Sequence, residues 1–363
     1  MLSAILILCL QNLPLGARPE SKDMTIDATV RAAVIAEAAK DLEENYVFPE
    51  VAKRMAAMLA EKQKSKEYDR LGSAKAFAKQ LTDDLQAISH DKHLRVRYEE
   101  AALPPVAPVP PGEANHEHEP SAAELAEFRA EAARNNFGFV KVERLEGNVG
   151  YVDFREFVPA VIASEKATQV MGFLADTDAL ILDLRKNGGG SPDQVAWICS
   201  YLFEGRVHLN DLYFRPGDRT EEFWTNPDVP GAKYVGKDVY VLTSNYTFSG
   251  AEEFAYNLKT QERATLIGET TGGGANPGGM SRLHEHFSMF LPMGRAINPI
   301  TKTNWEGVGV EPDVKIASDK ALAKAQVLAL EKLIASQPEV LPFERKEALA
   351  ARQAELDGKV AKN

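Results

Sequence analysis

The chain has 363 residues, 44% apolar and 26% charged, a composition that indicates a globular protein with a large core and excludes wholesale disorder. Lys+Arg 42 against Asp+Glu 53 gives a net charge of −11, and neither this balance nor any basic run supplies the positive cluster that a nucleic-acid partner requires. The two cysteines, Cys9 and Cys199, exclude a disulfide framework and a cysteine-rich metal site. After these exclusions, an enzyme is the first class of protein to consider.

Residues 1–23 contain an apolar run, Ala4–Leu10, followed by Arg18. The run is too short for an integral membrane span, which needs about 20 residues. It fits the apolar part of an export signal cleaved after Ala17, although no Lys or Arg precedes it. We expect an exported protein, periplasmic or extracellular, if this segment is a signal peptide. If it is a frayed terminus or a wrongly assigned start, we expect a cytoplasmic protein.

Residues 24–98 are predicted to form a helical-bundle domain. Apolar residues recur there at helical spacing. Phe48-Pro49 separates the first helix from the second, and Leu71-Gly72-Ser73 separates the second from the third. From Leu94 to Tyr98 apolar and polar residues alternate, which indicates a short strand.

Residues 99–145 are predicted to be a proline-rich connector followed by a helix. Residues 103–120 are rich in proline and poor in bulky side chains, as in a semi-rigid linker or a long surface loop. Within them, His116–Glu119 places two imidazoles beside two carboxylates. Because no distant third ligand accompanies them, a solvated loop is a better interpretation than a metal site.

Residues 146–318 show a change to alternating strands and helices. Strand character is found in Val149–Val152, Ala179–Leu184, Val239–Leu242 and Ala264–Ile267, and helices are expected from Ser191-Pro192 and over Ala251–Leu258. This rhythm predicts an α/β core (α+β by some criteria) with a largely parallel sheet. Residues 319–363 are predicted to form a C-terminal helix, roughly Lys320–Ala335, and a charged tail.

Three loops after these strands carry the candidate chemistry, because open α/β sheets hold their sites at the carboxyl ends of strands. Arg185–Pro192 contains Gly188, Gly189 and Gly190, whose N–H groups suit an anion unless the loop is a plain tight turn. Thr243–Glu253 places Ser249 at a helix N-terminus, which favours developing negative charge, and Gly250 lets a substrate approach closely. Gly268–Gly279 has the glycines of a loop that could border a cleft.

Ser249 has two interpretations on local sequence. It suits a nucleophile, but Ser249-x-x-Glu252 is also a capping box, in which the serine only ends the helix. A nucleophile needs a base, and the histidines, at positions 90, 93, 116, 118, 208, 284 and 286, are not distinguished by local sequence. His284 and His286 are expected to share one face of a strand, His208 to lie in a surface strand, and His93 to end the helical region beside Asp91.

Four motifs occur in an order and spacing that resemble the tail-specific (C-terminal-processing) serine peptidases. They are Leu180–Gly190, Thr247–Glu253, Ala264–Gly274 and Gly307–Asp313. The helical region ending in Ser89–Val96 is similar to the repeat unit of interphotoreceptor retinoid-binding protein and its bacterial relatives. Together the resemblance covers most of residues 29–316.

Two departures from the family pattern narrow what the resemblance implies. Tail-specific peptidases carry a PDZ domain for which residues 99–145 leave no room, and their lysine base corresponds to Gly274 here. The tricorn protease branch uses histidine and glutamate instead. The resemblance then implies Ser249 as nucleophile, His93 as general base and Glu306 as the orienting group. Its implied oxyanion hole consists of the N–H of Gly250 and that of Gly188 or Gly189.

The resemblance implies a helical N-terminal domain beside a crotonase-like αβ core, without metal or cofactor. It implies a serine peptidase acting on peptides or unfolded protein segments, and the lack of a PDZ domain argues against recognition of C-terminal tails. The alternative is a non-catalytic protein that binds apolar ligands such as retinoids or fatty acids on the same fold. The presence of all three triad residue types favours the enzyme. Since Cys199 is expected on a buried helix face, the nucleophile should be a serine.

Overall fold

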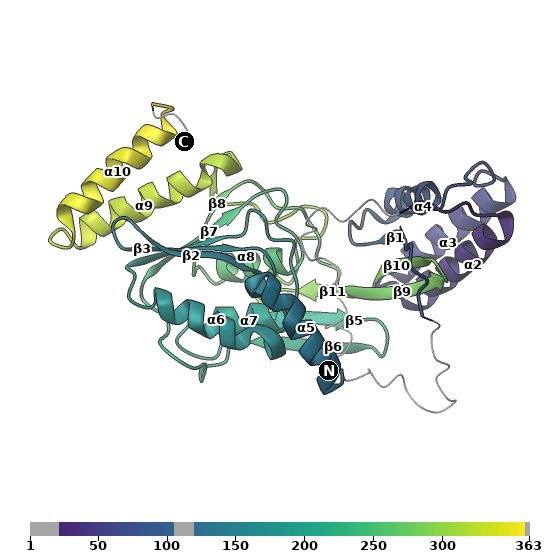
Figure 1. Ribbon diagram of the computed structural model, residues 1–363, viewed down its shortest axis with the longest axis horizontal. Coiled ribbons are helices and arrows are strands. Elements are labelled where there is room, and N and C mark those ends of the chain that lie inside the picture. The colour runs from purple at the N-terminus through teal and green to yellow at the C-terminus, as the bar shows by residue number, and fades with distance from the viewer. Residues whose placement is uncertain (1–21, 105–119, 360–363) are drawn as a thin grey trace. The chain divides into compact units, whose positions relative to one another are not determined.

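The computed structural model describes residues 22–104 and 120–359, and these residues form two compact units (Figure 1). The helical unit contains the residues up to Pro120 together with Asp211–Glu221 and Asn276–Ile297. The sheet unit contains Ser121–Asn210, Glu222–Ala275 and the residues from Asn298 onwards. The apolar run of the predicted signal segment and the His116–Glu119 tract lie outside the described residues.

The three predicted helices of the helical unit are confirmed. They are α2 (Ala28–Asn45), α3 (Pro49–Lys64) and α4 (Ala74–Ser89). The side chain of Asp27 accepts the Val30 N–H at 2.9 Å and so caps α2, and α3 starts with its proline, which has no N–H to leave unpaired. The predicted strand is also present, as β1 (Arg95–Tyr98).

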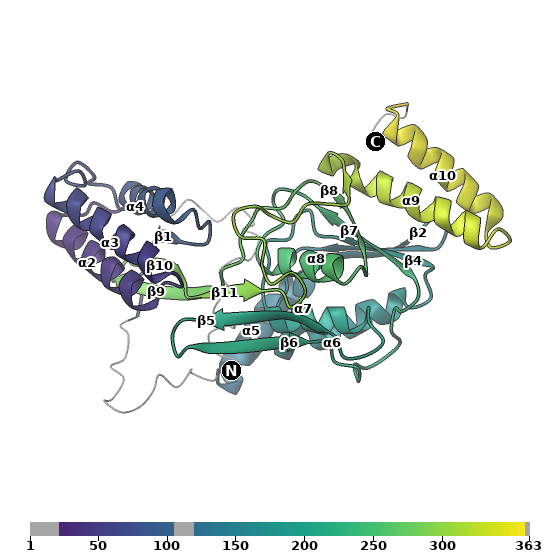
Figure 2. The same cartoon turned by 180° about the vertical axis from the view of Figure 1, so that it is seen from behind.

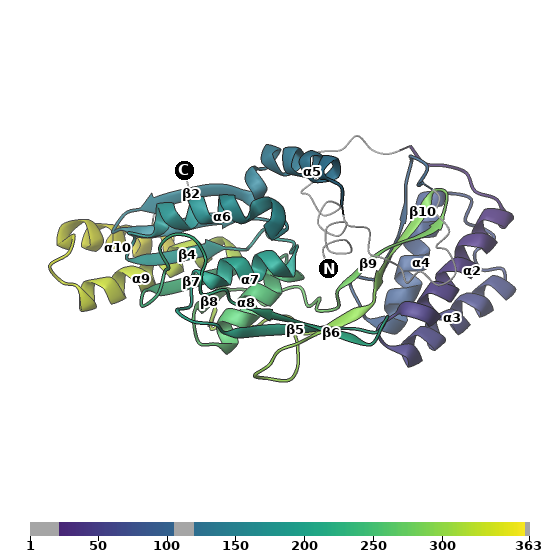
Figure 3. The same ribbon diagram turned by 90° about the horizontal axis from the view of Figure 1, so that it is seen from below.

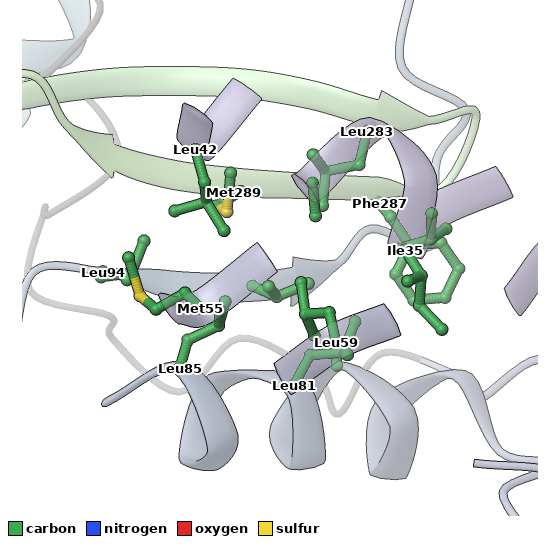
Figure 4. Packing of buried hydrophobic residues seen from close by; sticks show 14 of the residues in the cluster. Ile35, Leu42, Met55, Leu59, Leu81, Leu85, Leu94, Leu283, Phe287 and Met289 are labelled. Atoms are coloured by element: carbon green, nitrogen blue, oxygen red, sulfur yellow. The ribbon is translucent and has the colours of Figure 1, made fainter. Parts of the chain in front are cut away.

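A three-stranded antiparallel sheet, in the order β1-β10-β9, packs against these helices (Figure 4). Strands β9 (Gly278–His284) and β10 (Phe287–Pro292) come from far along the chain. The prediction that His284 and His286 share a strand face is wrong. His284 ends β9, whereas His286 lies in the turn before β10, with its Nδ1 3.0 Å from the carbonyl oxygen of Glu99.

The core of the helical unit leads to a stability prediction at Phe287, which is fully buried and packs edge-on against Phe77 with 5.9 Å between ring centroids. Phe287→Ala should lower the free energy of unfolding by about 3–5 kcal/mol, because it removes apolar contacts and leaves a cavity. The measurement is urea unfolding followed by far-UV circular dichroism. Phe343→Ala, at a ring that is 86% exposed, is the matched control and should change the value by less than about 0.5 kcal/mol. Equal effects at both positions would contradict this description of the core.

The sheet unit is built on six strands in the order β12-β8-β7-β4-β3-β2. Their bounds are β2 (Phe139–Leu145), β3 (Val149–Phe154), β4 (Ala179–Asp183), β7 (Asp238–Thr243), β8 (Thr265–Gly268) and β12 (Val314–Lys315). All neighbouring pairs are parallel except β2 with β3. The predicted α/β core with a largely parallel sheet is therefore confirmed, and β4 is buried along its whole length as expected.

Helices cover both faces of this sheet (Figures 1 and 3). Helices α6 (Ala160–Leu174), α7 (Pro192–Ser200) and α8 (Gly250–Thr260) pack on the face that carries Val152 and Leu182. Helix α9 (Ala321–Ser336) packs on the other face, which carries Tyr151 and Ile181. The helix expected in the connector is α5 (Ala122–Arg134). Successive residues of each strand thus face opposite layers, as the pleat requires.

The segment predicted only as a charged tail contains a further helix, α10 (Pro342–Leu356). Its Ala348 joins the apolar cluster formed by α9 and the sheet. Its Arg345 is fully buried, pairs with Asp178 at 2.6 Å and donates to the carbonyl oxygen of Gly147. This helix was not predicted because its sequence is rich in charged residues and lacks a pronounced apolar stripe. A buried arginine anchors it instead.

A third sheet has the order β11-β5-β6 (Figure 2). It contains β5 (His208–Phe214), β6 (Arg219–Trp224) and β11 (Gly294–Ile297), and the division between the two units falls within β5 and β6. His208 starts β5, as predicted for a strand residue, and its ring stacks on Trp224 at 4.1 Å. Among the described residues, no helix has both the length and the apolar character needed to cross a membrane.

Candidate active site

Ser249 lies at the turn between β7 and α8, as the sequence predicted, and its backbone is strained. Its φ of 54° and ψ of −125° fall outside the regions that a residue with a side chain adopts readily. Hydrogen bonds from Phe248 N–H to Asn187 O and from Thr247 Oγ1 to Leu184 O hold the turn in place. Strain kept in this way is typical of functional positions, including nucleophiles at strand-to-helix turns. This strain was not predictable from the sequence, because the G-x-S-x-G signature is absent.

The loop with three consecutive glycines packs directly on this turn. A Cβ atom on Gly189, whose φ is +109°, would lie 2.7 Å from the Cβ of Ser249 and 2.8 Å from the N of Gly250. A Cβ on Gly250 would lie 2.8 Å from the carbonyl oxygen of Gly190. Both glycines are therefore needed because two backbones meet here without room for side chains.

Two backbone N–H groups at this contact are not used by hydrogen bonds within the described residues. Those of Gly188 and Gly250 have no hydrogen-bond partner within residues 22–104 and 120–359. The N–H of Gly189 instead donates to Asn187 Oδ1 at 2.8 Å, and the Asn187 side chain is anchored by a bond to Phe154 O. Of the two glycines left open by the sequence as the second oxyanion donor, the geometry favours Gly188.

Glu306 belongs to the same unit as Ser249 and borders the third glycine-rich loop. Its Oε2 accepts the N–H of Ala275 at 2.5 Å. The neighbouring Trp305 donates from Nε1 to the carbonyl oxygen of Gly274 at 2.8 Å. The position that corresponds to the lysine base of tail-specific peptidases is thus occupied by a glycine whose carbonyl is engaged.

His93 lies in the helical unit, in the turn between α4 and β1. Its ring is buried and stacks on Phe290 with 5.6 Å between centroids. The backbone N–H of His93 donates to Asp91 Oδ1 at 2.9 Å. Burial, together with the nearby Arg95 charge, lowers the pKa of His93 to about 3. The ring is therefore neutral at physiological pH, which is the form that accepts a proton. Because Ser249 and Glu306 lie in the sheet unit, the pairing of His93 with them stays a prediction.

Two buried acids near these residues were not assigned a role from the sequence. Asp91 accepts hydrogen bonds from Tyr46 Oη and Asn276 Nδ2 as well as from His93 N–H, and burial raises its pKa. Glu252 appeared only as half of a capping box. Its carboxylate indeed accepts the N–H of Ser249 at 2.9 Å. The sequence signal that could have identified these two acids is their position close to a candidate catalytic residue: Asp91 is near His93, and Glu252 is near Ser249.

Comparison with known proteins assigns the chain to a family. Residues 148–316 match peptidase family S41, and residues 25–134 match the N-terminal domain of Peptidase_S41 in eukaryotic IRBP. The chain belongs to peptidase family S41. The resemblance inferred from the four motifs is thereby confirmed.

The chain is also similar to a curated protein and to solved structures. Carboxyl-terminal-processing peptidase 1 of Arabidopsis thaliana chloroplasts is 26% identical over 185 residues, which cover 48% of this chain and 35% of that protein. The solved structure of mature CPAF is similar with a TM-score of 0.55 and 13% identity, over 85% of this chain and 99% of that one. A lipoprotein from Streptococcus agalactiae has a TM-score of 0.51 and 13% identity, over 88% and 100% of the two chains. At such identities the structures show a shared fold.

The contact between Gly189 and Ser249 leads to a second prediction. Gly189→Ala should lower the free energy of unfolding by about 2–4 kcal/mol, because the new methyl group meets Ser249 and the positive φ is strained for alanine. Gly188→Ala is the matched control, since a Cβ there meets nothing within 4 Å. Chemical unfolding of both variants provides the measurement. A Gly189→Ala protein as stable as the control would contradict the close packing of the two loops.

A third prediction concerns pH and Glu253, the residue after Glu252 on α8. Burial, aided by the charge of Asp193, raises its pKa to about 8, although the amides of Asn210 and Asn257 oppose the shift. The folded protein therefore keeps a proton on this carboxyl above pH 4.5, where the unfolded chain releases it, so stability falls as pH rises through about 8. Glu253→Gln should remove part of this loss, so that its melting temperature exceeds that of wild type at pH 8.5 and matches it at pH 5. A wild-type to variant difference that does not change with pH would contradict the prediction.

Proposed function

We propose that the chain is a serine peptidase that hydrolyses peptide bonds in peptides or unfolded protein segments. The observation that carries the proposal is the strained Ser249 at the start of α8, packed against a glycine loop with open N–H donors. This arrangement supports the proposal because a hydroxyl group at a helix N-terminus and unpaired N–H groups beside it suit nucleophilic attack and a developing oxyanion. Membership of a peptidase family supports the same reaction class.

In the proposed mechanism Ser249 Oγ attacks the peptide carbonyl carbon while His93 accepts the hydroxyl proton. The N–H groups of Gly250 and Gly188 hold the oxygen that becomes negative. The protonated His93 then gives its proton to the leaving amine as the C–N bond breaks, and an ester on Ser249 remains. Water, activated by His93, hydrolyses the ester and restores the enzyme. Glu306 orients the imidazole and stabilises its positive charge, which an imidazole of low pKa requires.

One apolar cavity of the sheet unit is too small for the ligand of the alternative function, an apolar-ligand carrier. That cavity is lined by Phe139, Val170, Met171 and Phe254, among others, and has a volume of about 10 Å³. About 10–15 Å³ is needed for a single water molecule, so a retinoid or a fatty acid does not fit there.

The proposal is tested by activity and by labelling with a fluorophosphonate, which reacts with activated serines. Ser249→Ala should abolish labelling and should lower kcat on a denatured protein substrate by ~10⁴-fold or more, as should His93→Gln. His90→Asn is the matched control, because His90 lies three residues away on an exposed left-handed turn that asparagine tolerates. Labelling of Ser249→Ala at the wild-type rate would place the nucleophile elsewhere.

A further inference from the structure

The carboxylate of Glu252 makes more hydrogen bonds than a helix cap needs. Its Oε2 accepts the N–H of Ser249 at 2.9 Å and that of Gly274 at 2.8 Å. Its Oε1 accepts the Thr271 hydroxyl at 2.5 Å and the N–H of Gly273 at 2.6 Å. Four donors use the full accepting capacity of a carboxylate. Three of the four come from a loop about twenty residues further along the chain, so helix capping accounts for only one.

These bonds join three segments of the sheet unit. The Thr271 hydroxyl that donates to Glu252 also accepts the N–H of Val310 at 2.6 Å. Gly273, whose N–H is held by Glu252, accepts the N–H of Gly307 at 3.1 Å through its carbonyl oxygen. The turn that carries Ser249, the loop Thr271–Ala275 and the segment that carries Glu306 therefore meet through one buried side chain.

We propose that Glu252 is a positioning residue, whose ionised carboxylate holds the Ser249 turn and the Glu306 segment in one arrangement by binding the loop between them. The inference rests on the proposed peptidase function. Glu252 does not touch the reacting atoms. It fixes the backbone N–H of the nucleophile, so a change in its accepting capacity moves Ser249 relative to the oxyanion donors, and displacements of about 1 Å can cost about 100-fold in rate.

The ionisation of Glu252 is governed by burial and by these donors. Residues 247–253, 271–275 and 305–310 contain no Lys, Arg or His, and their other carboxyl groups are those of Glu253 and Glu306. Burial raises the pKa of Glu252 to about 7, while its four hydrogen bonds act in the opposite direction. A proton on the carboxyl would face an N–H or O–H donor, and one bond would have to open. The arrangement should loosen as pH falls through about 7, and His93, with a pKa of about 3, does not titrate in that range.

The test compares Glu252→Gln with Glu253→Gln. A glutamine at 252 accepts through one oxygen only and turns two N–H groups toward donors, so it imitates the protonated acid. Glu253 is the matched control: it is the adjacent buried glutamate, its pKa of about 8 leaves it mostly protonated at pH 7, and glutamine imitates that form. Both variants are assayed for kcat, KM and fluorophosphonate labelling between pH 5.5 and 8.5.

We expect Glu252→Gln to lower kcat by ~100-fold with KM changed less than about threefold. In wild type we expect kcat to fall as the pH is lowered through about 7; this fall is the acid limb of the pH profile of kcat. Glu252→Gln should lack the acid limb, whereas Glu253→Gln should keep both the wild-type kcat and the limb. A helix cap alone would cost stability but would leave the limb in place. The inference is overturned if Glu252→Gln retains the wild-type limb, or if both variants lose activity equally.

Failure of the proposed function is distinguishable from failure of this inference. If wild type neither cleaves nor reacts with the fluorophosphonate, the peptidase proposal fails. The positioning role is then read from amide hydrogen exchange at Gly273 and Gly274. Faster exchange there in Glu252→Gln, but not in Glu253→Gln, supports the bracing of the loop, and unchanged exchange overturns it.

Discussion

The parallel pairing of β4 with β7 determines where the two loops that form the candidate site begin. Asp183 is the register partner of Leu242, and the N–H of Leu184 continues the pairing onto Leu242 O at 3.0 Å. The loops that follow therefore start as neighbours at strand spacing, about 4.8 Å apart. The bond from Phe248 N–H to Asn187 O keeps them together beyond the strand ends. The glycines and the strain at Ser249 follow from this proximity, because two backbones so close leave no volume for Cβ atoms.

Buried carboxylates act as junctions between segments in the sheet unit. Asp183 accepts bonds from Tyr151 Oη at 2.8 Å and from Arg185 Nε at 2.8 Å, and Arg185 also donates to Ser318 O. Glu252 makes a comparable junction with uncharged donors only. Asp183 thus has a guanidinium partner, whereas Glu252, whose pKa burial raises to about 7, has no charged partner among its donors. The Asp183 pair suits a fixed connection within the fold. The proposed role of Glu252 makes the site sensitive to pH.

Local patterns in the sequence predicted most of the helices, the central strands and the loops that carry Ser249 and Gly188, whereas Glu306 was implied only by the family resemblance. They did so because a proline or glycine break, an apolar run and a glycine cluster each act within a few residues. The pairing of β1 with β10 was not predictable, since Arg95 and Phe290 are too distant in sequence for any periodicity to connect them. The bonds of Glu252 to Gly273 and Gly274 were missed for a related reason. The capping-box signature is the same whether or not tertiary structure brings further donors to the glutamate.

The anchoring of α10 has a consequence for shortened versions of the chain. Arg345 holds the β2–β3 turn through Gly147 O, while Gly147 N–H donates to Glu344 Oε1 at 2.8 Å, so the helix and the turn secure each other. Ala348 covers part of the apolar cluster that contains Leu330 and Leu333 of α9. A truncation before Pro342 would expose that surface to water and leave Asp178 without its guanidinium partner. Such a fragment should self-associate through α9, so a shortened protein for crystallisation should end after Leu356 and not before the helix.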